Sequence, residues 1–283
     1  MRRAIDRSLV VVTALCALVA AGALVAIVFA ILSRALPALD LTFVTRAMDR
    51  AGAAGGVLYH VIGTTLLVLT AALTSAPLAI AIALTHSVYL APGRLRRALS
   101  LTLYALNGIP SILFGILGLI VFVKALGWGK SWLAGGILLG LMILPTVAVA
   151  LIERIDVLPR RYVETALALG LRPAQVVWSV ILPQTAGGLL TGTLLGVARA
   201  AGETAPILFT AAVFSGATIP TGVVDQPVLA LPYHIFVLAQ DSFAPEVAAR
   251  VWGSAAVLLA LVSTLALIAL PVRARVHEEA RNV

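Results

Sequence analysis

Two oppositely charged residues stand one helical turn apart inside a long apolar stretch, in the run VARAAGETAP at residues 197–206. On a helix, Arg199 and Glu203 would share one face and partly neutralise each other. An arginine keeps its charge when it is desolvated, and its forked donors match the oxygens of phosphate. We therefore predict that Arg199 is a fixed cation on the path of an anionic substrate, and that Glu203 pairs with it when the site is empty.

A structural ion pair that holds this segment to its neighbours is the alternative for Arg199 and Glu203. A charge at the centre of a membrane helix costs about 2.5–3.5 kcal/mol, so such residues usually mark a functional path. The helix face beside the charges has small residues at every fourth position, which lets another helix approach closely. These residues are Gly188, Gly192, Gly196, Ala200 and Thr204. Pro206 should bend the helix beside the charges, because its nitrogen cannot donate to the carbonyl of Gly202.

A second interruption lies in the run NGIPS at residues 107–111. Pro110 removes a backbone hydrogen bond and directs its ring at the carbonyl of Leu106, so we expect a kink. Irregular backbone at membrane depth occurs where it lines a polar cavity. We predict that Asn107 and Pro110 mark a helix break that could serve as a gate; a tolerated bend without a function is the alternative.

The elements that must position these residues are membrane-spanning helices. Of the 283 residues, 61% are hydrophobic and only 11% are charged, and the mean hydropathy is +1.08. Helices are expected because backbone groups in lipid must pair within their own segment. We predict an all-α, polytopic membrane protein with six transmembrane helices in contact with lipid. The predicted spans cover about 9–32, 61–88, 101–123, 131–152, 184–213 and 251–271.

These spans divide the chain into three parts. Residues 1–56 hold a first helix and an outer loop, residues 57–272 hold a core of five spans, and residues 273–283 form a tail. The apolar stretch from Ser8 to Ser33 is longer than the roughly 7–15 residues of a signal peptide, so the first helix should be retained. The segments on the side of the amino terminus carry 13 Lys and Arg residues against 6 on the other side, which places both termini in the cytoplasm. The outer segment at about 215–250 could be a lid, a re-entrant piece or an ordered loop.

The cytoplasmic segment between the fourth and fifth spans predicts two short helices at about 159–183. Pro159 can begin the first, Gly170 can end it in a left-handed conformation, and Pro183 should stop the second. Apolar residues on both helices would seek a groove on a partner protein; packing on the inner ends of the spans is the alternative. The apolar residues are Val163, Leu167, Val177, Trp178 and Val180.

The run ETALALGLRPAQVVWSVILP at residues 164–183 resembles the cytoplasmic motif of permease subunits in ABC-type importers. The matching residues are Glu164, Ala166, Gly170, Leu182 and Pro183. Thr165 replaces an alanine of that motif and Val180 replaces an isoleucine. The resemblance implies that this segment is a coupling helix, which sits in a cleft of a dimeric cytoplasmic ATP-binding subunit.

The resemblance extends over roughly residues 60–270. The runs NGIPSILFGILG at 107–118 and ARAAGETAPILFTAA at 198–212 resemble the A-type permease subunits of phosphate-specific ABC importers in the inner membrane. This implies an ATP-driven importer of inorganic phosphate, with a second homologous permease of the C type and an extracytoplasmic phosphate-binding protein as partners. It also implies that Arg199 belongs to the phosphate passage.

Other functions are disfavoured by the distribution of charged and reactive residues. The net charge of +8 comes from short clusters between apolar stretches, which is typical of membrane topology and not of nucleic-acid binding. GWGKS at 127–131 resembles the end of a phosphate-binding loop, but Lys124 stands where its first glycine should be, so the chain should hold no ATP, no other cofactor and no metal. We do not expect a membrane-embedded enzyme, because the four histidines, His60, His86, His234 and His277, do not cluster in the sequence.

Two transport alternatives remain open. An ABC permease for sulfate, molybdate or tungstate would use the same arginine, because any tetrahedral oxyanion suits it. An ion-coupled secondary transporter should show inverted repeats and several acids at membrane depth, whereas Glu203 is alone there and no internal repeat is visible.

Overall fold

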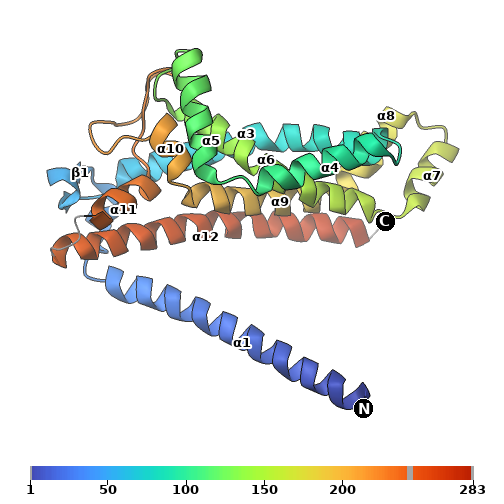
Figure 1. Ribbon diagram of the computed structural model, residues 1–283, viewed down its shortest axis with the longest axis horizontal. Helices are drawn as coiled ribbons and strands as arrows, with labels where there is room; N and C mark the ends of the chain where they lie inside the picture. Colours follow the sequence, from blue (N-terminus) through green and yellow to red (C-terminus); the bar gives the residue numbers. More distant parts are fainter. Residues whose placement is uncertain (1, 241–244, 282–283) are drawn as a thin grey trace.

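The computed structural model describes residues 2–240 and 245–281, and these residues form a bundle of long helices (Figure 1). The long helices are α1 (Arg2–Ala35), α3 (Leu58–Leu84), α4 (Arg94–Asn107), α6 (Trp132–Asp156), α9 (Leu182–Gly202) and α12 (Pro245–Arg281). Shorter helices are α2 (Leu41–Thr45), α5 (Ser111–Gly118), α7 (Arg160–Ala168), α8 (Pro173–Val176), α10 (Ala205–Thr210) and α11 (Leu231–Gln240). A small antiparallel pair, β1 (Met48–Asp49) and β2 (Ala54–Gly55), and the 3₁₀ turn η1 (Arg50–Gly52) lie at the end of the molecule opposite α7 (Figure 1). We call this end the outer end and the α7 end the cytoplasmic end, after the topology that the sequence predicts.

The membrane spans confirm the predicted number. Among the described residues, five helical segments are long and apolar enough to cross a membrane, and a bent pair brings the number to six if it forms one span. The five uninterrupted spans are Leu9–Ala35, Leu58–Tyr89, Trp132–Asp156, Pro173–Gly202 and Pro245–Ile268. The bent pair joins Arg94–Asn107 to Ser111–Ala125 at an angle of 94°.

The fifth span differs from its prediction at both ends. It begins at Pro173 instead of about 184, because the second cytoplasmic helix continues into it. Pro183 does not stop the helix: the π-helical turn η4 (Val177–Ile181) precedes it, and there backbone N–H groups pair one residue further back than in an α-helix. The span ends at Gly202 instead of about 213, because Pro206 prevents the bond that would continue it.

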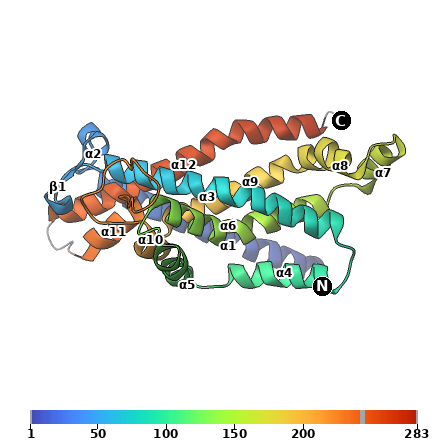
Figure 2. The same cartoon turned by 90° about the horizontal axis from the view of Figure 1, so that it is seen from above.

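Helix α6 lies at the centre of the bundle, with α3 and α9 packed against it (Figure 2). Small residues allow these close approaches. Gly136 and Gly140 of α6 face Thr70 and Thr74 of α3, so closely that an added Cβ would overlap them. The large side chains of α6 fill the space between the contacts and are almost completely buried. These residues are Leu138, Leu139, Met142, Ile143, Val147 and Leu151.

The predicted row of small residues on α9 is the face that meets α6. An added Cβ at Gly192 would lie 2.8 Å from the Cβ of Ala150, and one at Gly196 would lie 3.2 Å from Ile143. Ala200 continues the row and is buried, whereas Thr204 lies beyond the end of the helix. The row therefore fixes how α9 presents the residues on its other faces.

The outer end of the bundle is an ordered cap. The backbone N–H of Leu231, where α11 begins, donates to the Thr64 hydroxyl of α3 at 2.9 Å. Arg250 of α12 donates to the carbonyl of Gly55 at 2.9 Å and lies over the ring of Phe43. The outer segment at 215–250 thus contains a helix, α11, that packs on α3 and α12.

Helix α1 packs against α12 and otherwise diverges from the bundle (Figure 1). Most of its apolar residues from Leu9 to Leu32 are exposed, and none of its most hydrophobic window is buried within this chain. The Arg34 guanidinium lies 4.8 Å from the centre of the Trp252 ring and adds a contact at the outer end of the helix pair. The beginning of α1, the end of α12 and α7 lie at the same end of the molecule.

Candidate functional site

The Arg199–Glu203 pair is present, and it lies at a helix break. Arg199 is in the last turn of α9, and Glu203 is the residue at which that helix ends. The Arg199 Nε lies 3.6 Å from Glu203 Oε1, so the side chains form an ion pair. The Arg199 side chain is 35% exposed and that of Glu203 is 17% exposed within this chain. The Arg199 side chain, near the end of a membrane span, is therefore only partly covered by this chain.

The break follows from the local sequence. Glu203 has an extended backbone, and α10 begins two residues later at Ala205. Pro206 occupies the first turn of α10, where its missing N–H costs nothing, and it leaves the Gly202 carbonyl without an α-helical donor. The predicted bend is thus a complete interruption beside the two charges.

The predicted break at 107–111 is followed by a helix that contacts the segment just after Glu203. Helix α5 starts after Pro110 and packs against α10: Gly115 meets Ala205 and Pro206, and Gly118 meets Thr210. Both helices run in the same direction from their breaks, because the contacts advance along both in the same order. Two interrupted spans therefore meet near the Arg199–Glu203 pair.

Asn107 connects this region to α6. The Thr146 hydroxyl donates to Asn107 Oδ1 at 2.9 Å, next to Pro145 in α6. The bond leaves the Asn107 amide nitrogen available as a donor, because no bond from it is present among the described residues. Asn107 and Pro110 thus lie at a bend of 94°, and their role as a gate stays a prediction.

The cytoplasmic motif forms α7 and the turn that follows it. Gly170 has a φ of +83°, its N–H donates to the Leu167 carbonyl, and the Leu171 N–H donates to the Ala166 carbonyl. This pair of bonds is a Schellman motif, which needs glycine at the left-handed position. The predicted role of Gly170 in ending the helix is confirmed.

Some residues of this motif are exposed, and others pack on the core of the bundle. Glu164 and Thr165 are exposed on α7, whereas Ala166 is 6% exposed and packs in the main core cluster. Leu182 packs on that cluster as well, and Pro183 is exposed at the start of α9. Ala166 thus fixes α7 against the bundle while its neighbours face outward.

The apolar residues of the cytoplasmic segment likewise include both buried and exposed side chains. Val177 is 3% exposed and belongs to the core cluster, so its prediction as a docking residue is wrong. Val163 and Val180 are half-buried and pack on the same cluster. In contrast, Trp178 is 72% exposed and Leu167 is 46% exposed at the cytoplasmic end. These two side chains remain the candidates for contact with a partner.

The run GWGKS forms a turn that joins two helices. Gly127 and Gly129 have positive φ angles, and the Lys130 ammonium donates to the carbonyls of Leu208 and Ala212 at 2.9 and 3.3 Å. Lys130 therefore satisfies carbonyl groups at the end of α10. Ser131 begins α6 by accepting from the Ala134 N–H.

Two long-range pairs were not apparent from the sequence. His60 of α3 and His234 of α11 are 1% and 3% exposed, and their ring centres lie 4.1 Å apart, so the expectation that the histidines do not cluster is wrong for these two. Both nitrogens of His60 are buried without a hydrogen-bond partner in the described chain. Arg96 and Asp156 form an ion pair at the cytoplasmic end across 60 positions of sequence. Only the folded chain brings such residues together.

Comparison with known proteins identifies the class of protein to which this fold and site belong. Residues 75–274 match the family described as the binding-protein-dependent transport system inner membrane component. The fold is similar to that of a chain of the MetNI methionine ABC transporter in an inward-facing conformation, with a TM-score of 0.61, 17% identity and coverage of 78% of this chain and 95% of that chain. The chain therefore belongs to this family and is a multi-pass membrane component of a transport system.

Individual relatives within the family carry more specific names. The chain is 34% identical to the probable phosphate transport system permease protein PstA of Methanocaldococcus jannaschii, over 82% of this chain and 81% of the relative. It is 33% identical to the phosphate transport system permease protein PstA 2 of Mycobacterium bovis, over 84% and 77%. It is also 26% identical to the probable ABC transporter permease protein YqgI of Bacillus subtilis, over 87% of both chains. The predicted family is thereby confirmed, and the chain is a permease subunit, not a catalytic one.

Proposed function

We propose that the chain is the permease subunit of an ATP-driven importer of inorganic phosphate and forms half of its translocation pathway. The relatives named as phosphate permeases support the substrate, and the partly open Arg199 at a helix break is the observation that carries the mechanism. A guanidinium can release a carboxylate and donate hydrogen bonds to phosphate oxygens in the same forked geometry.

The ion pair would change partner as phosphate passes. Without substrate, Glu203 neutralises Arg199 at 3.6 Å. A phosphate ion that reaches Arg199 would accept hydrogen bonds from its guanidinium in place of Glu203. The interrupted backbone near Ser111 and Ala205 would offer free polar groups that a continuous helix does not have. When phosphate leaves, Glu203 would bind the arginine again, so the cation is never left unpaired in a medium of low polarity.

Helix α7 would transmit to this pathway the conformational change that accompanies ATP hydrolysis. Its exposed residues, Glu164 and Thr165, would contact a dimeric cytoplasmic ATP-binding subunit, with Trp178 and Leu167 as further contacts. ATP would be bound by that subunit, and this chain would need no cofactor. Movement of α7 would reach the pathway along α8, η4 and α9, which form one continuous helical segment.

The complete importer would need two further proteins. A second homologous permease of the C type would close the pathway, because one bundle exposes Arg199 on its own surface. An extracytoplasmic phosphate-binding protein would deliver substrate to the outer cap. Both termini would be cytoplasmic, which is supported by the position of α7, the beginning of α1 and the end of α12 at one end of the molecule (Figure 1).

Reconstitution tests this function. The chain would be combined with its ATP-binding subunit and second permease in liposomes, and ATP-dependent uptake of labelled phosphate would be measured with the binding protein present. Excess sulfate, molybdate or tungstate should leave uptake unchanged. Uptake of one of these anions in place of phosphate would establish the alternative substrate, and uptake driven by an ion gradient without ATP would contradict the ABC mechanism.

A further inference from the structure

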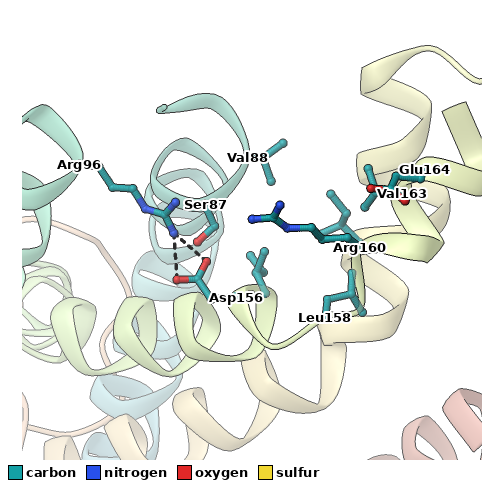
Figure 3. A pocket seen from close by; sticks show the side chains of 10 residues that line it. Ser87, Val88, Arg96, Asp156, Leu158, Arg160, Val163 and Glu164 are labelled. Carbon is teal, nitrogen blue, oxygen red and sulfur yellow. Dashed lines mark hydrogen bonds and ion pairs between the residues drawn. The ribbon is translucent and has the colours of Figure 1, made fainter. Parts of the chain in front are cut away.

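A cavity of about 520 Å³ opens at the cytoplasmic end, between α7 and the ends of three spans (Figure 3). It lies away from the Arg199–Glu203 pair and has a polar lining from four separate elements: η2 (Thr85–Tyr89), α4, α6 and α7. The polar residues are Ser87, Arg96, Asp156, Arg160 and Glu164. The volume is within the range of about 300–1,000 Å³ that small-molecule sites occupy.

The two arginines of the cavity have unused donors. Arg96 binds both oxygens of Asp156 through one nitrogen, Nη2, at 2.9 and 3.0 Å, which leaves its Nε and Nη1 without a partner among the described residues. The Arg160 side chain extends from α7 into the cavity, in the direction of Ser87 and Asp156 (Figure 3). Its guanidinium forms no ion pair within the described part of the chain.

The charged groups of the cavity are unevenly placed. Two guanidinium groups face one carboxylate, that of Asp156, while Glu164 stays close to α7 (Figure 3). The lining is therefore neutral as a whole, and its two guanidinium groups lie on the side away from Glu164 (Figure 3). Apolar side chains of Val88, Leu158 and Val163 form part of the wall.

We propose that this cavity binds a phosphate-type oxyanion between Arg96 and Arg160. The free nitrogens of the two guanidinium groups match the oxygens of such an ion. An anion bound there would link α7 to α4 and α6, because the arginines belong to α7 and α4 and Asp156 ends α6. Its presence would therefore restrain the helix that carries Glu164.

The oxyanion could come from two sources with the same chemistry. One is free inorganic phosphate in the cytoplasm, and the other is the phosphate of a phospholipid headgroup at the inner membrane surface. The proposal does not depend on the Arg199 pathway, so a separate variant can remove that site from the experiment.

The test measures binding of inorganic phosphate to the full chain with Arg199→Gln, purified in a maltoside detergent that has no phosphate. Titration calorimetry should show saturable binding, and adding Arg160→Gln should weaken it at least about tenfold, which corresponds to about 1.4 kcal/mol. Arg161→Gln is the matched control, because Arg161 is adjacent on α7 but does not line the cavity and lies 5.4 Å from the Tyr162 ring centre. Equal thermal midpoints would show that both variants are folded.

A second titration with added phosphatidylglycerol distinguishes the sources. If the lipid headgroup is the occupant, the lipid should weaken phosphate binding in the Arg161→Gln protein; if free phosphate is the occupant, binding should be unchanged. Either result supports the cavity as an oxyanion site. Equal affinity of the Arg160→Gln and Arg161→Gln proteins, or no saturable binding in the detergent, would overturn the proposal.

Discussion

Arg199 and Glu203 each lie at a position where the ends of helices favour their charge. Arg199 is in the last turn of α9, where free carbonyl groups attract a cation, and Glu203 lies just before α10, where free N–H groups attract an anion. The sequence predicts both residues on one continuous helix, which would have placed Arg before Glu in the less favourable order. The break therefore lowers the cost of keeping two charges within a membrane span.

Replacement of Arg199 by Gln tests its place in the anion path. Arg199→Gln should lower the rate of phosphate uptake at least about tenfold, or about 1.4 kcal/mol, because an amide cannot supply a charge. Arg199→Lys should retain more uptake than Gln, since it keeps the charge but loses the forked donors. The ATP-binding subunit should co-purify equally with all three proteins. Uptake near the normal rate in the Gln variant would show that the pair is structural.

His234 predicts a pH dependence of stability at the outer end. Burial, assisted by the positive charge of Arg250, lowers the pKa of His234 from 6.5 to about 4. Between pH 6.5 and 4, His234 is therefore protonated in the unfolded chain but neutral in the folded chain. The free energy of unfolding keeps its full value above pH 6.5 and decreases as the pH falls through this range. The slope for one proton is about 1.4 kcal/mol per pH unit.

The prediction for His234 is checked by the pH dependence of thermal stability, given the groups that surround its ring. His60 of α3 and the Phe214 ring contact it, and Arg250 of α12 is the charged group that acts on it. The thermal midpoint of the purified chain should fall between pH 6.5 and 4, and His234→Phe should reduce that fall. An unchanged pH profile in the variant would contradict the prediction.

At the scale of elements, the close contact of α6 and α9 depends on residues without side chains. Gly192→Ala should lower the thermal midpoint, because the new Cβ would lie 2.8 Å from the Cβ of Ala150 and the two helices would have to separate. Gly22→Ala is the control: nothing lies within 4 Å of its added Cβ, so it should raise helix stability by up to about 1 kcal/mol. Equal effects of the two substitutions would show that α6 and α9 tolerate a wider spacing.

The turn after α7 can be tested independently of surface charge. Gly170→Val should weaken the coupling of ATP hydrolysis to transport, because a β-branched residue at a φ of +83° would strain the turn that positions α7. Gly127→Val is the matched control at a φ of +68°, also with open space around the added Cβ, in the outer turn. Only the first should raise the ratio of ATP hydrolysed to phosphate transported. The same ratio in both variants would exclude a specific role for this turn.

Across the whole molecule, the proposed pathway and the motif on α7 lie at opposite ends of the helical segment Pro173–Gly202, so the proposed function requires them to act together. Glu164→Lys should uncouple ATP hydrolysis from uptake, since it reverses an exposed charge on the surface proposed to meet the ATP-binding subunit. Glu153→Lys makes the same change on an exposed residue of α6 outside the motif and should leave coupling intact. Full coupling in the Glu164 variant would defeat the docking role of α7.

Local features of the fold were predictable, and features that depend on pairing between distant segments were not. The spans, the Gly170 turn and the small-residue face of α9 follow from periodicity, glycine and helix geometry within a short stretch. The end of α9 at Gly202 required knowing how completely Pro206 interrupts it, and the path of the helix past Pro183 required the π turn at Val177–Ile181. The His60–His234 and Arg96–Asp156 pairs arise from tertiary packing.

The π turn η4 has a mechanical consequence for the helix that runs from α8 into α9. A π turn holds one more residue than the α-helical turn it replaces. If the segment rewound into regular α geometry, that residue would add about 100° of rotation between its two ends. A conformational change at the cytoplasmic end could then rotate Arg199 about the axis of α9. No helix would need to translate across the membrane.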